Sequence, residues 1–258
     1  MLPRLASAPA IAAIFSIFLS ISSVEAAPFA IDFDRDEAGS LLTAGSTDLR
    51  ITDPYANLFS PGLGVLLSTN NEPANPLNLY DSEGAGGQDN DLERNPGTWD
   101  GGSEVATVFD NLLIVNTNST ISTPNDNGGG GQMTLDFGLA LLSFGFDFVD
   151  LDASANATLI LFSSATNSSV SIPFTEFEDG SGSIHETSSV LFGDRHANSI
   201  RDITAAEIGL PSFDRVTFSL TSSGGIGTAY FDTVPEPDTG LTLLISAMAL
   251  IHFRPRRK

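Results

Sequence analysis

The 258-residue sequence contains no cysteine, and this absence narrows what the protein can be. Without cysteine, neither a disulfide framework nor thiol chemistry is available to the chain. Stability must therefore come from a buried apolar core or from bound ions. Eighteen phenylalanines, with frequent Leu, Ile and Val, indicate that the chain can bury such a core and argue against intrinsic disorder.

Positive charge is also scarce. The formal net charge is -21, and residues 27–233 hold 29 Asp and Glu residues against 6 Arg. An electrostatic field of this sign repels nucleic-acid phosphates and anionic membranes, and it keeps a protein soluble. Nucleic acid is therefore excluded as a partner.

Motifs of nucleophilic catalysis are missing from the chain. No G-x-S-x-G sequence occurs, and His185-Glu186 lacks the second histidine of an H-E-x-x-H motif. The glycines at 128–131 are not followed by Lys-Ser or Lys-Thr, so we expect a turn between strands there rather than a phosphate-binding loop. A glycoside hydrolase needs only two suitably placed carboxylates, and the many acidic residues leave a secreted polysaccharide-active enzyme open as an alternative.

The first 26 residues have the features of a secretory signal peptide. Arg4 precedes an apolar run from Ala10 to Ile21, and Val24 and Ala26 occupy the -3 and -1 positions of a signal-peptidase site. A membrane anchor or a buried helix is the alternative, but the run is short and ends in small residues. We therefore expect signal peptidase to remove residues 1–26.

Short alternating segments, separated by Gly, Pro, Asn and Asp, dominate residues 27–233. In the clearest of them, Phe144, Phe146 and Phe148 share one side of an expected strand. Strands are expected at residues 30–34, 48–52, 64–69, 111–117, 132–137, 142–152, 157–164, 169–175, 214–221 and 228–234. Their spacing of about 8–12 residues predicts an all-β fold, a single antiparallel β-sandwich, with one short helical turn at Ile203–Gly209.

Two stretches rich in Pro, Gly and acidic residues interrupt this pattern, at Asn71–Glu104 and Ser122–Gln132. The first is expected to be a structureless loop, and loops of that length inside a compact domain are usually functional.

Aspartates in these loops and at one strand end offer the oxygen ligands that Ca²⁺ prefers. The predicted calcium ligands are Asp81, Asp89, Asp91, Asp126, Asp150 and Asp152. Acidic loops that are simply solvated are the alternative. An EF-hand is excluded, because Arg94 stands where that loop requires Gly.

Trp99 lies in the first of these loops, with Tyr80 in the same stretch and Tyr55 nearby. An exposed aromatic ring can stack on a sugar, so Trp99 is the candidate glycan contact of an alternative function, a carbohydrate-binding module. The competing interpretation is that these aromatic rings belong to the core of a β protein.

The C-terminal residues 234–258 have three parts. Pro235-Glu236-Pro237 is held extended, because each proline restricts itself and the residue before it. Thr239–Phe253 is apolar and, as a helix, about 22 Å long, short for a hydrocarbon core of about 30 Å. The basic residues that follow can extend its reach and remain cytoplasmic: Arg254, Arg256, Arg257 and Lys258. This order predicts a C-terminal transmembrane helix, whereas a terminal strand or amphipathic helix of the domain leaves the prolines and the basic cluster unexplained.

The sequence of motif, apolar segment and basic cluster resembles the PEP-CTERM sorting signal of exported bacterial proteins. The resemblance implies that a membrane-embedded exosortase recognises Pro235, Glu236 and Pro237 and removes the anchor. Asp238 departs from the pattern, since Ser or Ala is common at that position. The resemblance also implies an inner-membrane-anchored form before processing, and afterwards a place at the cell surface or in an exopolysaccharide-rich biofilm matrix.

The body of the chain is similar to a recurrent type of PEP-CTERM passenger. The similar segments are Leu79–Leu92, Asn111–Val115, Pro124–Phe137 and Val149–Asp152. This similarity implies a jelly-roll-like sandwich or a carbohydrate-module type of fold. We therefore expect an exported, non-enzymatic surface or matrix protein with calcium as its cofactor.

Overall fold

The computed structural model describes eight parts of the chain, all within one compact unit, Ala27–Val234. They are residues 29–35, 40–45, 65–71, 73–83, 89–94, 98–104, 109–151 and 156–234. The expected signal peptide, the strand expected at 48–52, Asp152 and residues 235–258 lie outside these described residues. Within the described ranges, no helix combines the length and the hydrophobicity needed to cross a bilayer.

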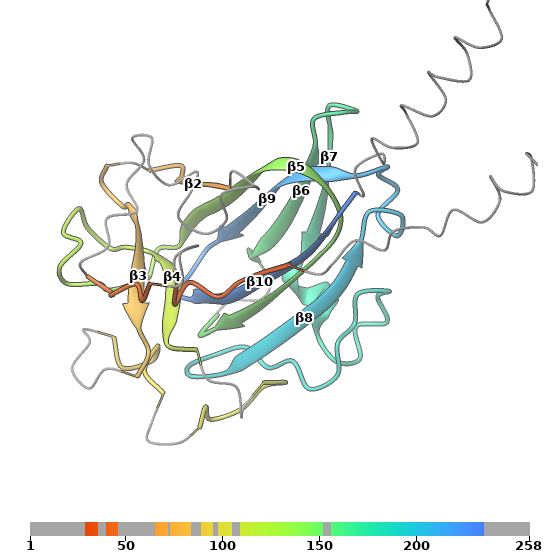
Figure 1. Ribbon diagram of the computed structural model, residues 1–258. Helices are drawn as coiled ribbons and strands as arrows, with labels where there is room; N and C mark the ends of the chain where they lie inside the picture. The colour runs from red at the N-terminus through yellow and green to blue at the C-terminus, as the bar shows by residue number, and fades with distance from the viewer. Residues whose placement is uncertain are drawn as a thin grey trace, which may run out of the picture. The chain divides into compact units, whose positions relative to one another are not determined.

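The described part of the chain is all-β, with ten strands in antiparallel pairs and one short 3₁₀ helix (Figure 1). The strands are β1 (Phe29–Ile31), β2 (Leu66–Thr69), β3 (Leu77–Asp81), β4 (Asn111–Val115), β5 (Gly131–Val149), β6 (Thr158–Ser163), β7 (Ser168–Pro173), β8 (Ala197–Thr204), β9 (Phe213–Leu220) and β10 (Gly225–Thr233). The 3₁₀ helix, η3, covers Phe174–Phe177 and follows β7.

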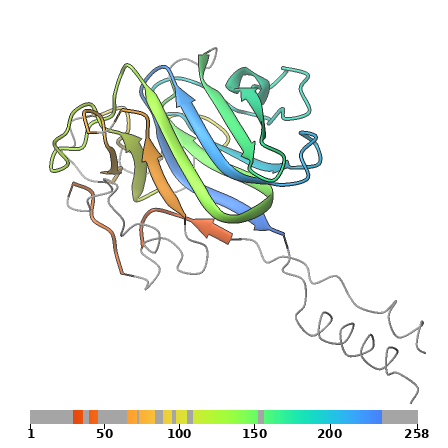
Figure 2. The ribbon, with the colours of Figure 1, turned by 90° about the horizontal axis from the view of Figure 1, so that it is seen from above.

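Strand β5 joins two groups of strands. Its first part, residues 131–136, pairs with β2 on one side and β9 on the other, and β6 and β7 continue beyond β9. Its second part, residues 143–149, pairs with β8 and β10, and β4, β3 and β1 attach through β10. The pairing with β9 shifts register between Asp136 and Leu141, where β5 bends (Figures 1 and 2). The sheet therefore curls into a half-barrel.

The inner side of the curl holds a core dominated by phenylalanine. The Phe146 ring lies 4.9 Å from the Phe218 ring and 5.7 Å from the Phe174 ring, measured between centroids. Phe146 and Phe218 have no exposed surface. Edge-to-face and tilted pairs of this kind add to the stabilisation that comes from burial alone. The aromatic core therefore stabilises a fold that has no disulfide bonds.

Every described segment that was expected to form a strand contains one. The structure differs from the expectation in the continuity of β5 and in the conformation of Ile203–Gly209. The segments expected at 132–137 and 142–152 form one continuous strand, because β9 and β10 extend the pairing across the bend. Ile203 and Thr204 end β8, and a turn follows at residues 205–209. The glycines at 128–131 form the expected turn, which ends where β5 begins.

Two strands lie where none was predicted. β3 falls inside the stretch expected to be a structureless loop, where its five residues pair along the whole of β4. β8 was missed because its sequence, ANSIRDIT, is too polar to show an apolar alternation, yet its first four residues are buried beside β5.

Candidate metal centre

The strand register brings several chain segments together at one end of the sheet. Val149, the last residue of β5, pairs with Gly225 at the start of β10 and with Ala197 at the start of β8. Gly225 also pairs with Ile114, near the end of β4. The segments that follow β4 and β5, and those that precede β8 and β10, therefore meet at this end.

Three aspartates from separate segments approach one another there. Asp91, Asp150 and Asp194 each offer a carboxylate oxygen, and these three oxygens lie within 4.8 Å of one another. Asp150 is 1% exposed, whereas Asp91 and Asp194 are exposed. Asp150 Oδ1 accepts a hydrogen bond from the Arg195 backbone N–H at 3.3 Å.

A fourth and a fifth aspartate adjoin this triad. Asp126 is 5% exposed, and its Oδ2 accepts a hydrogen bond from the Gly224 backbone N–H at 2.5 Å. Burial, the contact with the Asp89 carboxyl and the charges of Asp89 and Asp150 raise the pKa of Asp126 to about 9. Asp89 in turn accepts a hydrogen bond from the Asp91 backbone N–H at 3.0 Å. We call the five residues Asp89, Asp91, Asp126, Asp150 and Asp194 the acidic end.

Arg195 lies beside the acidic end, but its side chain contacts other groups. Its Nε donates to Asp100 Oδ2 at 2.7 Å, and its Nη1 donates to the Asn90 carbonyl oxygen at 3.4 Å. Carboxylates brought this close repel one another, and protonation or a cation must relieve the repulsion. The pKa of Asp126 is raised mainly by burial, and the repulsion by neighbouring carboxylates raises it further.

Four of the six predicted calcium ligands belong to the acidic end: Asp89, Asp91, Asp126 and Asp150. Asp152 lies outside the described residues. The sequence analysis missed Asp194, because its position depends on the pairing of β8, which was not predicted. The only local signal is that Asp194 adjoins a glycine, Gly193, in a short segment between strands.

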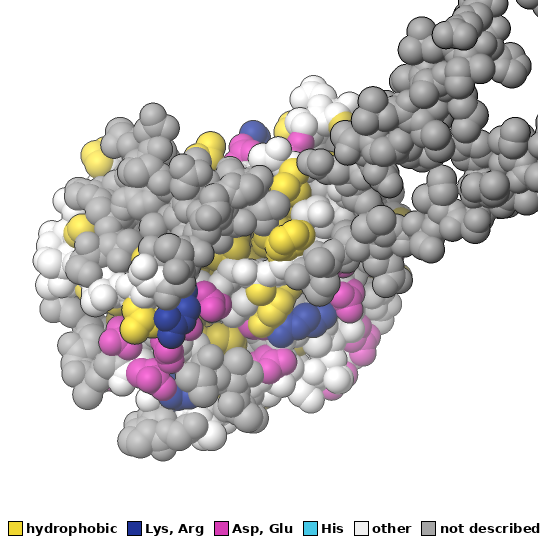
Figure 3. Space-filling view, viewed as in Figure 1, with side chains coloured by type: hydrophobic (Ala, Val, Ile, Leu, Met, Phe, Trp, Pro, Cys, Tyr) yellow, Lys and Arg dark blue, Asp and Glu magenta, His cyan; other side chains and the backbone are white. Residues whose placement is uncertain are grey.

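Asp81 is the sixth predicted ligand, and it lies away from the acidic end. It ends β3 opposite Asn111, at the start of β4, whereas the acidic end adjoins the end of β4. Asp81 lines a pocket of about 330 Å³ with Asp34, Glu83 and Asp110, which we call the acidic pocket. Burial, together with the charge of Asp110, raises the pKa of Asp34 to about 6 against the hydrogen bond from the Asn111 backbone N–H. Figure 3 shows acidic side chains in several groups on one face, with few Lys or Arg side chains among them.

Trp99, the candidate glycan contact, is buried. Its ring is 3% exposed and packs beside Phe109, with ring centroids 6.3 Å apart. Tyr80 belongs to the same apolar cluster, is 1% exposed, and donates its hydroxyl hydrogen to the Asp89 carbonyl oxygen at 2.5 Å. The two aromatic side chains therefore pack as core residues, as the competing interpretation expected, and Trp99 does not offer a ring face for stacking on a sugar.

No protein-family model matches this chain, and no curated protein matches its sequence. The described part of the chain is an all-β protein domain, an antiparallel half-barrel with carboxylates from distant parts of the chain gathered at one end.

Proposed function

We propose that the protein is an exported, non-enzymatic component of the cell surface or extracellular matrix, and that Ca²⁺ bound at the acidic end stabilises its β domain. One observation carries the calcium proposal: five aspartates from four separate chain segments converge where β4, β5, β8 and β10 meet. Ca²⁺ takes six to eight oxygen ligands at about 2.3–2.6 Å, and flexible loops with carboxylates and carbonyls suit it.

The electrostatics give the cation a defined role. Without it, the high pKa of Asp126 keeps this carboxyl protonated at neutral pH, despite the hydrogen bond from Gly224. A bound divalent cation favours the ionised carboxylates, so binding releases protons. The same cation links the 89–91 segment to the ends of β5 and β8, and a ligand that binds only the folded state raises its stability.

We further propose that the half-barrel is a jelly-roll-like β-sandwich, in which β5 contributes to both sheets. One sheet would contain β2, β5, β9, β6 and β7, and the other β8, β5, β10, β4 and β3. The separate partners of the two parts of β5 support this division.

Thermal unfolding of the full chain with and without Ca²⁺ tests the metal proposal. With free Ca²⁺ at about 100 times Kd, we expect the melting temperature to exceed that of the chelated protein by about 5–10 °C. Circular dichroism measures the shift, with Mg²⁺ as the comparison cation. An unchanged melting temperature after chelation contradicts the proposal.

Two matched substitutions locate the effect. Asp150→Asn at the acidic end should abolish the calcium-dependent shift, and the chelated variant should melt no lower than the chelated parent, because one repulsive charge is gone. Asp81→Asn removes the same charge from the acidic pocket and should leave the shift intact. If the two variants respond alike, the acidic end is not the calcium site.

Export and sorting depend on the terminal segments, and the support for them is the tripartite pattern of residues 234–258 and the signal-like residues 1–26. In this proposal signal peptidase acts first, and an exosortase-type enzyme then processes the C-terminal signal. Replacing Pro235, Glu236 and Pro237 with alanine should leave an uncleaved, membrane-held form in the native host. Cell fractionation, with mass spectrometry of both mature termini, measures this outcome, and identical behaviour of variant and parent rules out the sorting role.

A further inference from the structure

Another candidate site lies on the outer face of the sheet, away from the acidic end and from the acidic pocket. An open groove of about 480 Å³ crosses β2, β5 and β9. Its lining includes Asn70, Gln132, Thr134, Asp136, Arg215 and Thr217, and we call it the polar groove.

Strand alternation explains why polar side chains gather there. On β5, Met133 and Leu135 are buried in the core, whereas Thr134 and Asp136 between and after them are half-buried on the other face. β9 follows the same alternation, and its register places Arg215 opposite Asp136 and Thr217 opposite Thr134. The groove is therefore built on three paired strands, and its residues are not needed to fill the core.

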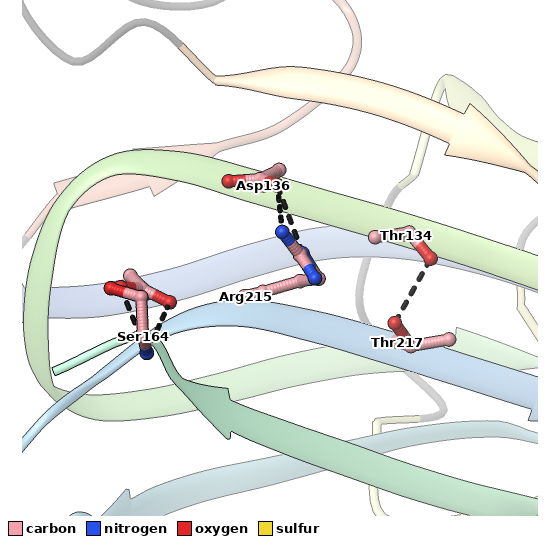
Figure 4. Close-up of polar contacts among 6 residues, drawn as sticks. Thr134, Asp136, Ser164, Arg215 and Thr217 are labelled. Atoms are coloured by element: carbon pink, nitrogen blue, oxygen red, sulfur yellow. Dashed lines mark hydrogen bonds and ion pairs between the residues drawn. The ribbon is translucent and has the colours of Figure 1, made fainter. Parts of the chain in front are cut away.

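Hydrogen bonds hold these side chains in place (Figure 4). Arg215 Nε and Nη2 lie 2.9 and 2.8 Å from Asp136 Oδ2, and the Thr134 and Thr217 hydroxyl oxygens are 2.9 Å apart. The Arg215 guanidinium carbon lies 5.0 Å from the centre of the Phe162 ring, which supports it from the neighbouring strand β6. Side chains ordered before binding lose little entropy when a ligand arrives.

The charge of the polar groove excludes two classes of ligand. Its one cation, Arg215, is already paired with Asp136, so an anionic ligand finds no free positive charge there. The single carboxylate is engaged in the same ion pair, which leaves too few ligands for a metal ion. The net charge of -21 repels acidic polymers further. A neutral polar ligand remains.

We infer that the polar groove binds a neutral polysaccharide chain. Hydroxyl and amide side chains both donate and accept hydrogen bonds, as the hydroxyls of a sugar require of their partners. Apolar side chains flank the groove on both sides: Leu66, 43% exposed, is opposite Asp136, and Ile160, half-buried, is opposite Thr217. They offer contacts for the C–H faces of sugar rings. The inference rests on the proposed export, which places the groove where polysaccharides occur.

Affinity electrophoresis of the full chain, in mild detergent, tests the inference. The gels contain dextran, laminarin, mannan or xylan as neutral probes, or alginate as an acidic one. We expect at least one neutral polysaccharide to retard the protein and alginate not to do so. Asp136→Ala and Arg215→Ala should each weaken the retardation about tenfold or more, because each leaves its partner and the sugar hydroxyls without a hydrogen bond.

Asp214→Ala is the matched control. Asp214 also lies on β9, and its carboxylate accepts hydrogen bonds from Ser164 rather than lining the groove. This variant should bind as the parent does. No retardation by any neutral probe, binding of alginate alone, or unchanged binding by both groove variants would overturn the inference. The calcium-dependent melting shift is measured on the same variants. If Arg215→Ala keeps this shift but loses glycan binding, the loss is local to the polar groove. If Asp150→Asn loses the shift but still binds glycan, the polar groove binds independently of the metal site.

Discussion

Each part of strand β5 carries one aspartate that pairs with an arginine of a neighbouring strand, and the two aspartates differ in burial. Asp136 pairs with Arg215 at 2.8 Å, and Asp147 pairs with Arg201 at 2.8 Å. The Asp136 side chain is 38% exposed, whereas that of Asp147 has no exposed surface. Exposed ion pairs contribute little to stability, but a buried charge that loses its partner is costly. The same two residue types therefore form one pair that stays in contact with water and another that is a structural requirement.

The same contrast extends along the strand. Residues 132–137 alternate between half-buried and buried side chains, whereas residues 143–149 are all buried, because β8, β10 and the core surround them. The first part supplies the polar groove, and the second part leads to Asp150 at the acidic end. A single strand thus carries a solvent-facing surface and a fully enclosed one.

Phe146→Ala, in the enclosed part, should have the largest effect. Phe146 contacts Phe144, Phe148, Phe174 and Phe218, and removing a buried Phe ring costs about 3–5 kcal/mol of unfolding free energy. Urea unfolding of the full chain at constant Ca²⁺ measures the loss. Leu142→Ala, a change at an exposed position of the same strand, should cost under about 1 kcal/mol. Equal losses would remove the distinction between enclosed and exposed positions of β5.

Arg201→Met should have the next largest effect, about 2–3 kcal/mol, because it leaves the buried Asp147 carboxylate without its cation. The Tyr230 hydroxyl, which donates to Asp147 Oδ2 at 2.6 Å, limits the loss. The double variant Asp147→Asn/Arg201→Met should recover part of the stability, since no unpaired charge remains. A double variant less stable than Arg201→Met would contradict this explanation.

Arg215→Met should have the smallest effect, about 0–1 kcal/mol, because its partner Asp136 remains in contact with water. The same urea unfolding experiment measures it beside Arg201→Met. A loss as large as that of Arg201→Met would show that the polar groove is a structural part of the sheet.

The sequence predicted the strands whose apolar residues alternate and missed those whose burial comes from pairing. β9 shows Val216, Phe218 and Leu220 at every second position, so it could be predicted directly. β8 buries Asn198, whose side chain donates to the Leu191 carbonyl oxygen at 2.7 Å. A buried polar residue that is satisfied by the backbone of the preceding loop gives no signal in the apolar pattern of the strand.

The sequence predicted the residue type of the candidate site, aspartate, but not which aspartates belong to it. Aspartate in a loop or at a strand end can be read from the sequence, and this selected Asp89, Asp91, Asp126 and Asp150. Which of these aspartates meet depends on strand register, which placed Asp81 elsewhere and brought in Asp194. The burial of Trp99 likewise depends on Phe109 and its neighbours, which no local pattern connects to it.

The position of β10 has a mechanical consequence. This strand, the last among the described residues, is hydrogen-bonded to β5 on one side and to β1 and β4 on the other. The Val234 backbone N–H donates a further hydrogen bond to the Ala140 carbonyl oxygen at 2.9 Å. A pull applied at Val234 along the strand therefore loads these bonds together in shear instead of opening them one after another. Force that reaches the domain through its C-terminal end would therefore act on several strands at once.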